Sequence, residues 1–357
     1  MKQIKPILGK LYRSAQFFNE MERTDYIRLD GNESVDGLPE DFVKNTLGEI
    51  TAKQLAAYPN PRRCTEAVAD YLGVKREEIL LTNGSDAAIK MLFEVYVNAG
   101  DRVIIAAPCF EMYEVYCHMH GAEPVILNYG EDFEFPYDAY LSELQKGAKL
   151  AIITNPNNPT GTVLPEDALL DIISAAEKKD VLLMIDEAYY WIYEKTIVPQ
   201  IKKHNNLVVL RTFSKILAIA GLRLGVAIAN EDLITDLKKV TPPAGVNTIA
   251  LLFGEKIIKD KSLIKKLIDT FKVDKGYLIS RLQENNIPYV NTDSNYVLIK
   301  LKVENPKKIL DRFKDKGVLV SYKMNQYLRV NIGSKKYMDA FIDAYKEIVI
   351  SRTTSGL

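Results

Sequence analysis

The chain of 357 residues is long enough for two domains with a sizeable core, and its 47% apolar and 26% charged residues are ordinary for a globular protein. Lysine plus arginine and aspartate plus glutamate each number 47, so charge gives no argument for a nucleic acid or a membrane surface as a partner. No apolar run approaches the roughly 18 residues of a membrane span, and residues 1–16 are too broken by charge for a signal peptide. Three cysteines without a close pair favour a reducing, cytoplasmic setting.

The first 30 residues lack a sustained hydrophobic period, so we expect an arm that packs against the rest of the molecule. A turn-rich stretch follows at residues 29–34 and contains Asn32. A second turn, residues 58–61, is extended because its two prolines restrict the backbone. A position at the protein surface, without any function, would by itself explain either turn. Residues 65–72 then read as a helix.

From residue 79 the chain alternates short apolar runs with helical stretches, for example residues 87–98 and 165–179. This alternation indicates a mostly parallel sheet that is covered by helices on both faces. The seven expected strands are residues 79–81, 103–106, 124–127, 150–154, 181–185, 207–210 and 224–229.

Polar residues follow five of these strands, where ligands of such sheets bind. Each one alone could be a helix cap or a turn residue, but five clusters at five strand ends indicate one shared site. Gly84 allows a tight turn before Ser85 and Asp86 open a helix, whose free amides and dipole can hold a phosphate. The other candidates are Phe110, Asn158, Asp186, Tyr189, Thr212, Ser214 and Lys215.

Residues 212–225 surround a lysine with groups that suit a phosphate. Thr212 and Ser214 flank Lys215, and Arg223 follows between two glycines. A lysine becomes a covalent catalyst when its amine condenses with a carbonyl, and pyridoxal 5′-phosphate combines an aldehyde with a phosphate. The stretch alone could be a solvated surface, so the other strand ends decide in favour of a cofactor site.

No metal site is expected. His118 and His120 are two positions apart on a probable helix, so they point to different faces. No nearby cysteine or acidic pair completes a coordination shell.

From about residue 246 a long lysine-rich helical region, residues 248–285, leads into a smaller α/β unit. Its expected strands lie near residues 295–301, 318–322 and 327–332, with a closing helix near 335–349. We therefore expect an α/β protein with an N-terminal arm (1–30), a large domain (31–245) and a small C-terminal domain (246–357).

The ordered motifs NGSDAA, PCF, NPNNPTG, DEAY, TFSK and GLRLG resemble those of the fold-type I aminotransferases that use pyridoxal phosphate. Within that superfamily the chain is most similar to the histidinol-phosphate aminotransferase branch, which has segments like LYRSAQ, LDGNES, AYPNP and YLRVNIGS. The resemblance covers about residues 29–333. It implies an aspartate-aminotransferase-like fold, with a seven-stranded sheet between helices and a smaller α/β domain.

The resemblance also implies roles for the strand-end residues. Lys215 would hold the cofactor covalently and later carry a proton between substrate and cofactor. Asp186 would pair with the pyridine nitrogen, and this cationic partner would make a buried aspartate tolerable. Asn158 and Tyr189 would hydrogen-bond the phenolic oxygen, and Phe110 would stack on the ring.

The implied phosphate ligands are the amides of Ser85 and Asp86 with the side chains of Thr212, Ser214 and Arg223. Tyr58 resembles a tyrosine that reaches this phosphate from a partner subunit. The resemblance therefore implies a homodimer with shared active sites.

For the substrate, Arg329 matches the family arginine that binds a carboxylate, although a surface arginine on an edge strand is the alternative. Tyr12 matches a tyrosine that helps to bind a substrate phosphate, and we also expect Asn32 to bind the substrate. Ser321 stands where that branch commonly has a second arginine. Lys323 lies close enough to replace it, but as a point charge rather than a bidentate fork.

The expected reaction moves an amino group between a small, phosphorylated amino compound and a 2-oxo acid such as 2-oxoglutarate. Histidinol phosphate or a related amino-alcohol phosphate is the expected substrate. One alternative is a decarboxylase of a phosphorylated amino acid, which uses the same scaffold. A non-catalytic binding module is another, but Lys215 and Asp186 are intact and no helix-turn-helix is appended.

Overall fold

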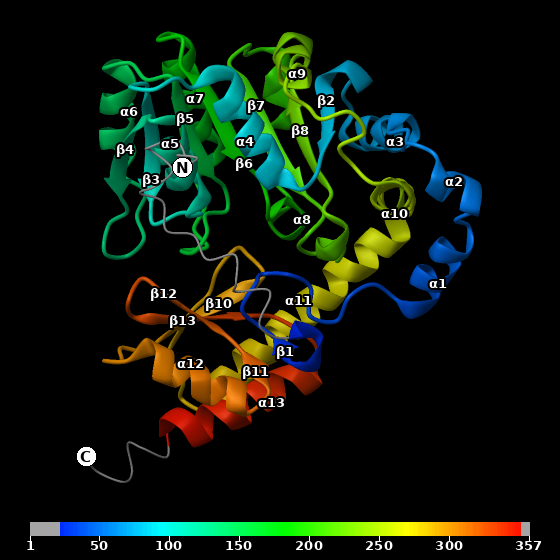
Figure 1. Ribbon diagram of the computed structural model, residues 1–357. Helices are drawn as coiled ribbons and strands as arrows, with labels where there is room; N and C mark the ends of the chain where they lie inside the picture. Colours follow the sequence, from blue (N-terminus) through cyan, green and yellow to red (C-terminus); the bar gives the residue numbers. More distant parts are fainter. Residues whose placement is uncertain (1–21, 351–357) are drawn as a thin grey trace, which may run out of the picture.

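In the computed structural model, residues 22–350 are described, and a seven-stranded sheet forms the larger half of the molecule (Figure 1). The strand order is β2-β8-β7-β6-β5-β3-β4, and only β8 runs antiparallel to its neighbours. The predicted mostly parallel sheet is therefore confirmed. The strands are β2 (Ile79–Thr82), β3 (Arg102–Ala107), β4 (Glu123–Asn128), β5 (Leu150–Thr154), β6 (Leu182–Asp186), β7 (Leu207–Thr212) and β8 (Gly225–Ala229).

Helices cover both faces of this sheet, because alternate side chains of its strands point to opposite faces. On β3, Ile104 joins one core, whereas Val103 and Ile105 join the other. The face of Val103 packs against α4 (Ser85–Tyr96), α5 (Met112–His120) and α9 (Glu231–Lys238). The face of Ile104 packs against α3 (Arg62–Leu72), α6 (Tyr137–Gln145), α7 (Glu166–Glu177) and α10 (Thr248–Lys259).

A four-stranded antiparallel sheet of order β12-β13-β10-β9 forms the smaller half (Figure 1). Its strands are β9 (Tyr289–Val290), β10 (Tyr296–Lys300), β12 (Ser321–Lys323) and β13 (Tyr327–Asn331). It shares a hydrophobic core with α11 (Lys261–Glu284), α12 (Pro306–Asp315) and α13 (Lys335–Tyr345). The remaining helices labelled in Figure 1 are short: α1 (Glu40–Gly48), α2 (Ala52–Ala56) and α8 (Tyr190–Tyr193).

Two expected elements are divided. The helical region 248–285 is two helices, since Asp260 accepts a hydrogen bond from the Leu263 amide and so caps the start of α11. The strand expected at 318–322 is split into β11 (Val318–Leu319), which pairs with β1 (Ile27–Arg28), and β12, which pairs with β13. Different partners on either side of Val320 explain the split.

α10 packs in the core of the large sheet, and α11 contributes residues to the cores of both halves. The boundary between the large and the small domain, predicted between residues 245 and 246, stays a prediction. Within residues 22–350, no helix combines the length and the apolar character needed to cross a membrane.

Candidate active site

The carboxyl ends of β5, β6 and β7 lie side by side, because Thr154 pairs with Asp186 and Asp186 pairs with Leu210 in parallel register. Beyond them lies a cavity of about 350 Å³. Six residues singled out from the sequence line this cavity: Asn32, Phe110, Asn158, Lys215, Lys323 and Arg329.

Lys215 follows β7, and its Nζ lies 5.8 Å from the centre of the Tyr189 ring. Burial, with a further contribution from the Arg329 guanidinium, lowers the pKa of Lys215 to about 8. More of the amine is therefore neutral near pH 7 than in an exposed lysine. The neutral amine is the form that attacks a carbonyl carbon.

Asp186 is the last residue of β6 and is 4% exposed. Its Oδ2 accepts a hydrogen bond of 2.9 Å from the Tyr113 hydroxyl, and its Oδ1 accepts one of 3.0 Å from the Ala188 amide. Burial raises the pKa of Asp186 to about 6, against the lowering effect of these two donors. Such a carboxylate would gain from a cationic partner.

Tyr113 and Thr154 were not identified from the sequence. The Tyr113 hydroxyl has one proton, which goes to Asp186, so Thr154 Oγ1, at 2.8 Å, donates to the Tyr113 oxygen. Tyr113 is three residues after Phe110 and lies on α5, so it comes close to Asp186 only through the packing of α5 on the sheet. Thr154 ends β5, so the rule that polar residues at strand ends form the site could have found it.

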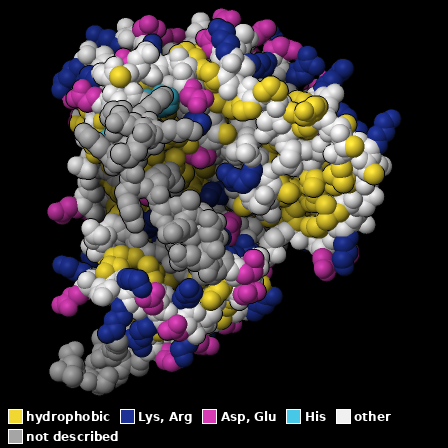
Figure 2. All heavy atoms as spheres, in the orientation of Figure 1, with side chains coloured by type: hydrophobic (Ala, Val, Ile, Leu, Met, Phe, Trp, Pro, Cys, Tyr) yellow, Lys and Arg dark blue, Asp and Glu magenta, His cyan; other side chains and the backbone are white. Residues whose placement is uncertain are grey.

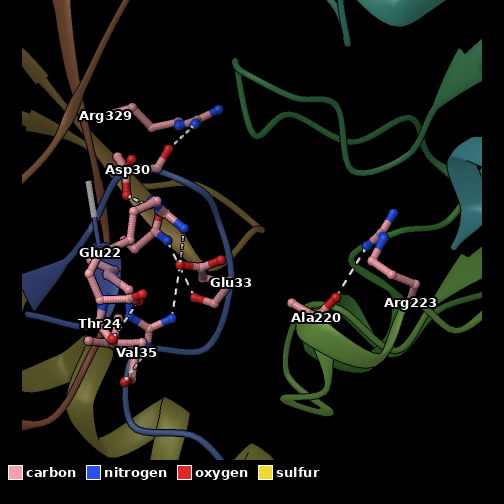
Figure 3. Close-up of polar contacts among 11 residues, drawn as sticks. Glu22, Thr24, Asp30, Glu33, Val35, Ala220, Arg223 and Arg329 are labelled. Carbon is pink, nitrogen blue, oxygen red and sulfur yellow. Dashed lines mark hydrogen bonds and ion pairs between the residues drawn. The ribbon is translucent and has the colours of Figure 1, made fainter. Parts of the chain in front are cut away.

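Asn32 is 2% exposed although Gly31, its neighbour in the same turn, is exposed, so the explanation of Asn32 as a surface residue is wrong. Glu33 accepts from Arg23 and Arg28 at 2.9 Å each, and Asp30 accepts from Arg23 at 2.6 Å (Figure 3). These ion pairs hold the turn. Within it, Asn32 takes a positive φ of 55°, which asparagine tolerates better than most residues.

The Asn32 Nδ2 donates a hydrogen bond of 2.7 Å to the Tyr189 hydroxyl oxygen. Arg329 is also buried, at 6% exposure, and donates to the Asp30 carbonyl at 2.6 Å (Figure 3). It also donates to Asn158 Oδ1 at 2.9 Å. The alternative of a surface arginine is therefore wrong.

A second set of predicted residues meets at the start of α4. A Cβ on Gly84, which has a φ of 77°, would lie 2.4 Å from Arg223 Nη2, and one on Gly225 would lie 2.2 Å from the Ser85 amide nitrogen. These two glycines let the α4 N-terminus, β8 and Arg223 approach one another. The Asp86 side chain accepts a hydrogen bond of 3.0 Å from the Tyr116 hydroxyl, so the backbone amide is the group of Asp86 that remains to bind a phosphate.

The hydroxyls of Ser214 and Thr212 lie at the same corner. Arg223 Nη1 is 3.3 Å from Ser214 Oγ and 3.4 Å from the Ala220 carbonyl (Figure 3), and Thr212 Oγ1 accepts from the Ser214 amide at 3.1 Å. A helix N-terminus, hydroxyls and a guanidinium fit a phosphate. With Lys215 for an aldehyde and Asp186 for a protonated nitrogen, the residues fit pyridoxal phosphate.

The family model for aminotransferase class I and II matches residues 24–344. The chain belongs to this family. It is 33% identical over 328 residues to the histidinol-phosphate aminotransferase of Clostridium novyi, covering 90% of this chain and 91% of that protein. The aminotransferase is thus a transferase that uses pyridoxal phosphate as its cofactor, and its substrates are small amino and keto compounds.

Solved structures show that the aminotransferase has the expected aspartate-aminotransferase-like fold. The histidinol-phosphate aminotransferase of Sinorhizobium meliloti in complex with pyridoxal 5′-phosphate superposes with a TM-score of 0.87 at 20% identity, covering 99% of each chain. The L-threonine-O-3-phosphate decarboxylase of Porphyromonas gingivalis superposes with a TM-score of 0.78 at 22% identity, covering 91% of this chain and 99% of that one.

Tyr58 is 92% exposed and does not line the cavity of this aminotransferase. Tyr12 lies outside the described residues. Ser321 pairs with Arg329 across β12 and β13, and its Oγ is buried without a hydrogen-bond partner among the described residues. Lys323 does line the cavity, and burial together with Arg329 lowers its pKa.

Proposed function

We propose that this aminotransferase moves an amino group between a small phosphorylated amino compound and a 2-oxo acid such as 2-oxoglutarate in two half-reactions. Histidinol phosphate or a related amino-alcohol phosphate is the proposed amino donor. The observation that carries the proposal is the pair of cations, Lys323 and Arg329, in one cavity with Lys215. Two separate cations suit a substrate set with both a carboxylate and a phosphate.

When bound, pyridoxal phosphate supplies the electron sink that lets an amino group leave one compound and join another. Lys215 is proposed to hold the cofactor aldehyde and then to carry the proton to and from the substrate carbon. Asp186 keeps a proton on the ring nitrogen, and Phe110 covers the ring. The phosphate is held by Ser85, Asp86, Thr212, Ser214 and Arg223.

Tyr189 and Asn158 are proposed to hydrogen-bond the phenolic oxygen of the cofactor. Because Asn32 donates to the Tyr189 oxygen, the Tyr189 proton stays free for an acceptor in the cavity. Asn158 Oδ1 is engaged by Arg329, which leaves its Nδ2 as the donor. Asn32 and Arg329 therefore orient both groups.

We expect Tyr113→Phe to shift the pH dependence of cofactor binding. Asp186 must be ionised to pair with the ring nitrogen, and its folded pKa of about 6 lies above its ordinary value, so affinity falls as pH drops through about 6. Loss of the Tyr113 donor disfavours the ionised form and moves this fall upward by about one pH unit. Equilibrium dialysis of the apoprotein against cofactor across pH 5–8 measures it.

Tyr140→Phe is the matched control for this shift. Tyr140 is as buried as Tyr113, but its hydroxyl donates to the Ile152 carbonyl, away from Asp186. An equal shift in both variants, or none in Tyr113→Phe, would show that Tyr113 does not set the ionisation of Asp186.

For the substrate, Arg329 is proposed to bind the carboxylate of the 2-oxo acid and its amino acid. Its Nη1 and Nη2 each use one N–H in the bonds to Asn158 and Asp30, and its Nε has no partner, so three of its N–H groups have no acceptor among the described residues. Lys323, with Ser321 beside it on β12, is proposed to take the phosphate, and Tyr12 and Asn32 complete the substrate residues.

The test compares kcat/KM for histidinol phosphate, other short amino-alcohol phosphates and their unphosphorylated forms. A lost hydrogen bond to a charged group costs about 1.5–3 kcal/mol, so the phosphorylated form should be preferred about 10- to 100-fold. Lys323→Ala should remove most of this preference, whereas Lys300→Ala, on exposed Lys300 of β10, should leave it. Equal turnover of the phosphate-free compounds would refute a phosphorylated substrate.

A decarboxylase of a phosphorylated amino acid is the second candidate, because the Porphyromonas gingivalis decarboxylase shares this fold. Carbon dioxide released from phosphothreonine, without conversion of the cofactor to its amine form, would favour it over amino-group transfer.

We also propose a cytoplasmic homodimer with shared active sites. Residues 47–58 expose large hydrophobic side chains that a partner subunit would cover. These are Tyr58 at 92%, Leu55 at 61% and Leu47 at 46% exposure. Figure 2 shows hydrophobic side chains gathered on the side that carries α1 and α10. Tyr58 would then reach the phosphate of the partner's site.

A further inference from the structure

A second cavity, of about 360 Å³, also has Lys215 in its wall. It lies between residues 34–39 and α11. Among residues 22–350, Lys215 alone lines both this cavity and the one that contains Asn158 and Arg329. A ligand in the second cavity would therefore lie beside Lys215 without occupying the substrate cavity.

A buried carboxylate without a partner lines this second cavity. Asp274 on α11 is 9% exposed, and within the described part of the chain no hydrogen bond or salt bridge reaches it. Burial and the nearby Asp36 raise the pKa of Asp274 to about 6. An ionised carboxylate that is largely buried and has no cation in contact is destabilised, so this group is suited to a positively charged ligand.

The charged neighbours of Asp274 do not neutralise it by contact. Asp36 is itself acidic and accepts a hydrogen bond of 2.8 Å from the Ser334 amide. Lys335 lowers the pKa of Asp274 through space, but its Nζ lies over the Tyr277 ring, 5.2 Å from the centre. Lys266 lines the cavity eight residues earlier on α11, which is about 12 Å along the helix.

The rest of the wall is largely hydrocarbon, from residues that include Leu38, Leu267 and Phe271. Hard metal ions need six or more oxygen ligands, which such walls do not supply. Among residues 22–350 there is also no group of three acidic, histidine or cysteine side chains that could hold a metal. The ligand that matches is an organic cation with a short apolar chain.

We propose that the second cavity is a non-covalent site for an alkylammonium, whose N–H donates to Asp274 and whose carbon chain packs on Leu38, Leu267 and Phe271. The site holds an amine next to Lys215 without any bond to the cofactor. It does not depend on which amino compound the enzyme converts, so its test is separate from the test of the proposed function.

The test uses the holoenzyme and N,N-dimethylpropylammonium as the probe. A tertiary amine keeps one N–H when protonated but cannot condense with the cofactor aldehyde, so the signal reports non-covalent binding alone. Titration calorimetry at pH 7.5 should show that Asp274→Asn weakens binding about 10- to 100-fold. Asp269→Asn is the matched control, because exposed Asp269 lies on the same helix and pairs with Lys265; it should leave the affinity unchanged.

Asp274→Asn should fold, since it exchanges an unpaired buried charge for an amide of the same shape, and its melting temperature and cofactor content check this. A crystal structure of the wild-type holoenzyme with the probe gives a second readout that needs no variant. Density for the probe beside Asp274 supports the site. Unchanged affinity in Asp274→Asn, or density only in the cavity of Asn158 and Arg329, overturns it.

Discussion

Replacement of Lys215 by alanine is expected to abolish the absorbance band of the lysine-bound cofactor and to lower turnover by about 10⁴-fold or more. Proton transfer by a positioned group alone accounts for about 10²–10⁴-fold, and the covalent hold on the cofactor is lost as well. The start of α4 and Arg223 are untouched by the change, so the protein should fold and still bind free cofactor through its phosphate.

Absorbance spectra and single-turnover kinetics measure both effects. Lys272→Ala is the control, because Lys272 is an exposed lysine paired with Glu194 outside the cavity. A Lys215→Ala enzyme that kept substantial turnover would refute the role of this lysine in the covalent step.

Asp186→Asn should cause the second largest loss, about 10²–10³-fold in turnover. An asparagine has the same shape but no charge, so the ring nitrogen loses the partner that keeps its proton. Removal of one member of a buried charge pair costs about 3–5 kcal/mol. The loss should appear in kcat for every amino donor, because Asp186 acts on the cofactor and not on the substrate.

A matched control exists on α9, where Asp236 accepts a hydrogen bond of 3.0 Å from Tyr96. Asp236→Asn changes a more exposed tyrosine–aspartate pair outside the cavity and should leave kcat within about twofold. Equal losses in the two variants would mean that Asp186 supports the fold rather than the chemistry.

The sequence predicted the site residues best where they follow parallel strands. Phe110, Asn158 and Lys215 line one cavity, and Asp186 lies at the same strand ends, because the carboxyl ends of neighbouring parallel strands share one edge of a sheet. The alternation of strands and helices identified all seven strands of the large sheet. It does not encode their order, and the antiparallel β8 between β2 and β7 follows from long-range packing.

Residues placed by tertiary packing were missed. Tyr113 reaches Asp186 from a helix face, 73 positions away along the chain. Asp274 and residues 34–39 line the second cavity only because α11 packs against the N-terminal segment. The break between α10 and α11 at Asp260 could be predicted from the local sequence, since an aspartate before a helix is a common cap. It was missed because the apolar pattern continues on both sides.

The most direct test of the proposed function is a single half-reaction. Holoenzyme is mixed with histidinol phosphate in the absence of a 2-oxo acid, and the cofactor absorbance is followed. We predict that the band of the lysine-bound cofactor converts fully to that of the amine form, with one equivalent of carbonyl product, no carbon dioxide, and recovery of the band when 2-oxoglutarate is added. A cofactor band that stays unchanged with histidinol phosphate and with every related amino-alcohol phosphate, or release of carbon dioxide without that conversion from a phosphorylated amino acid, would contradict amino-group transfer from a phosphorylated substrate.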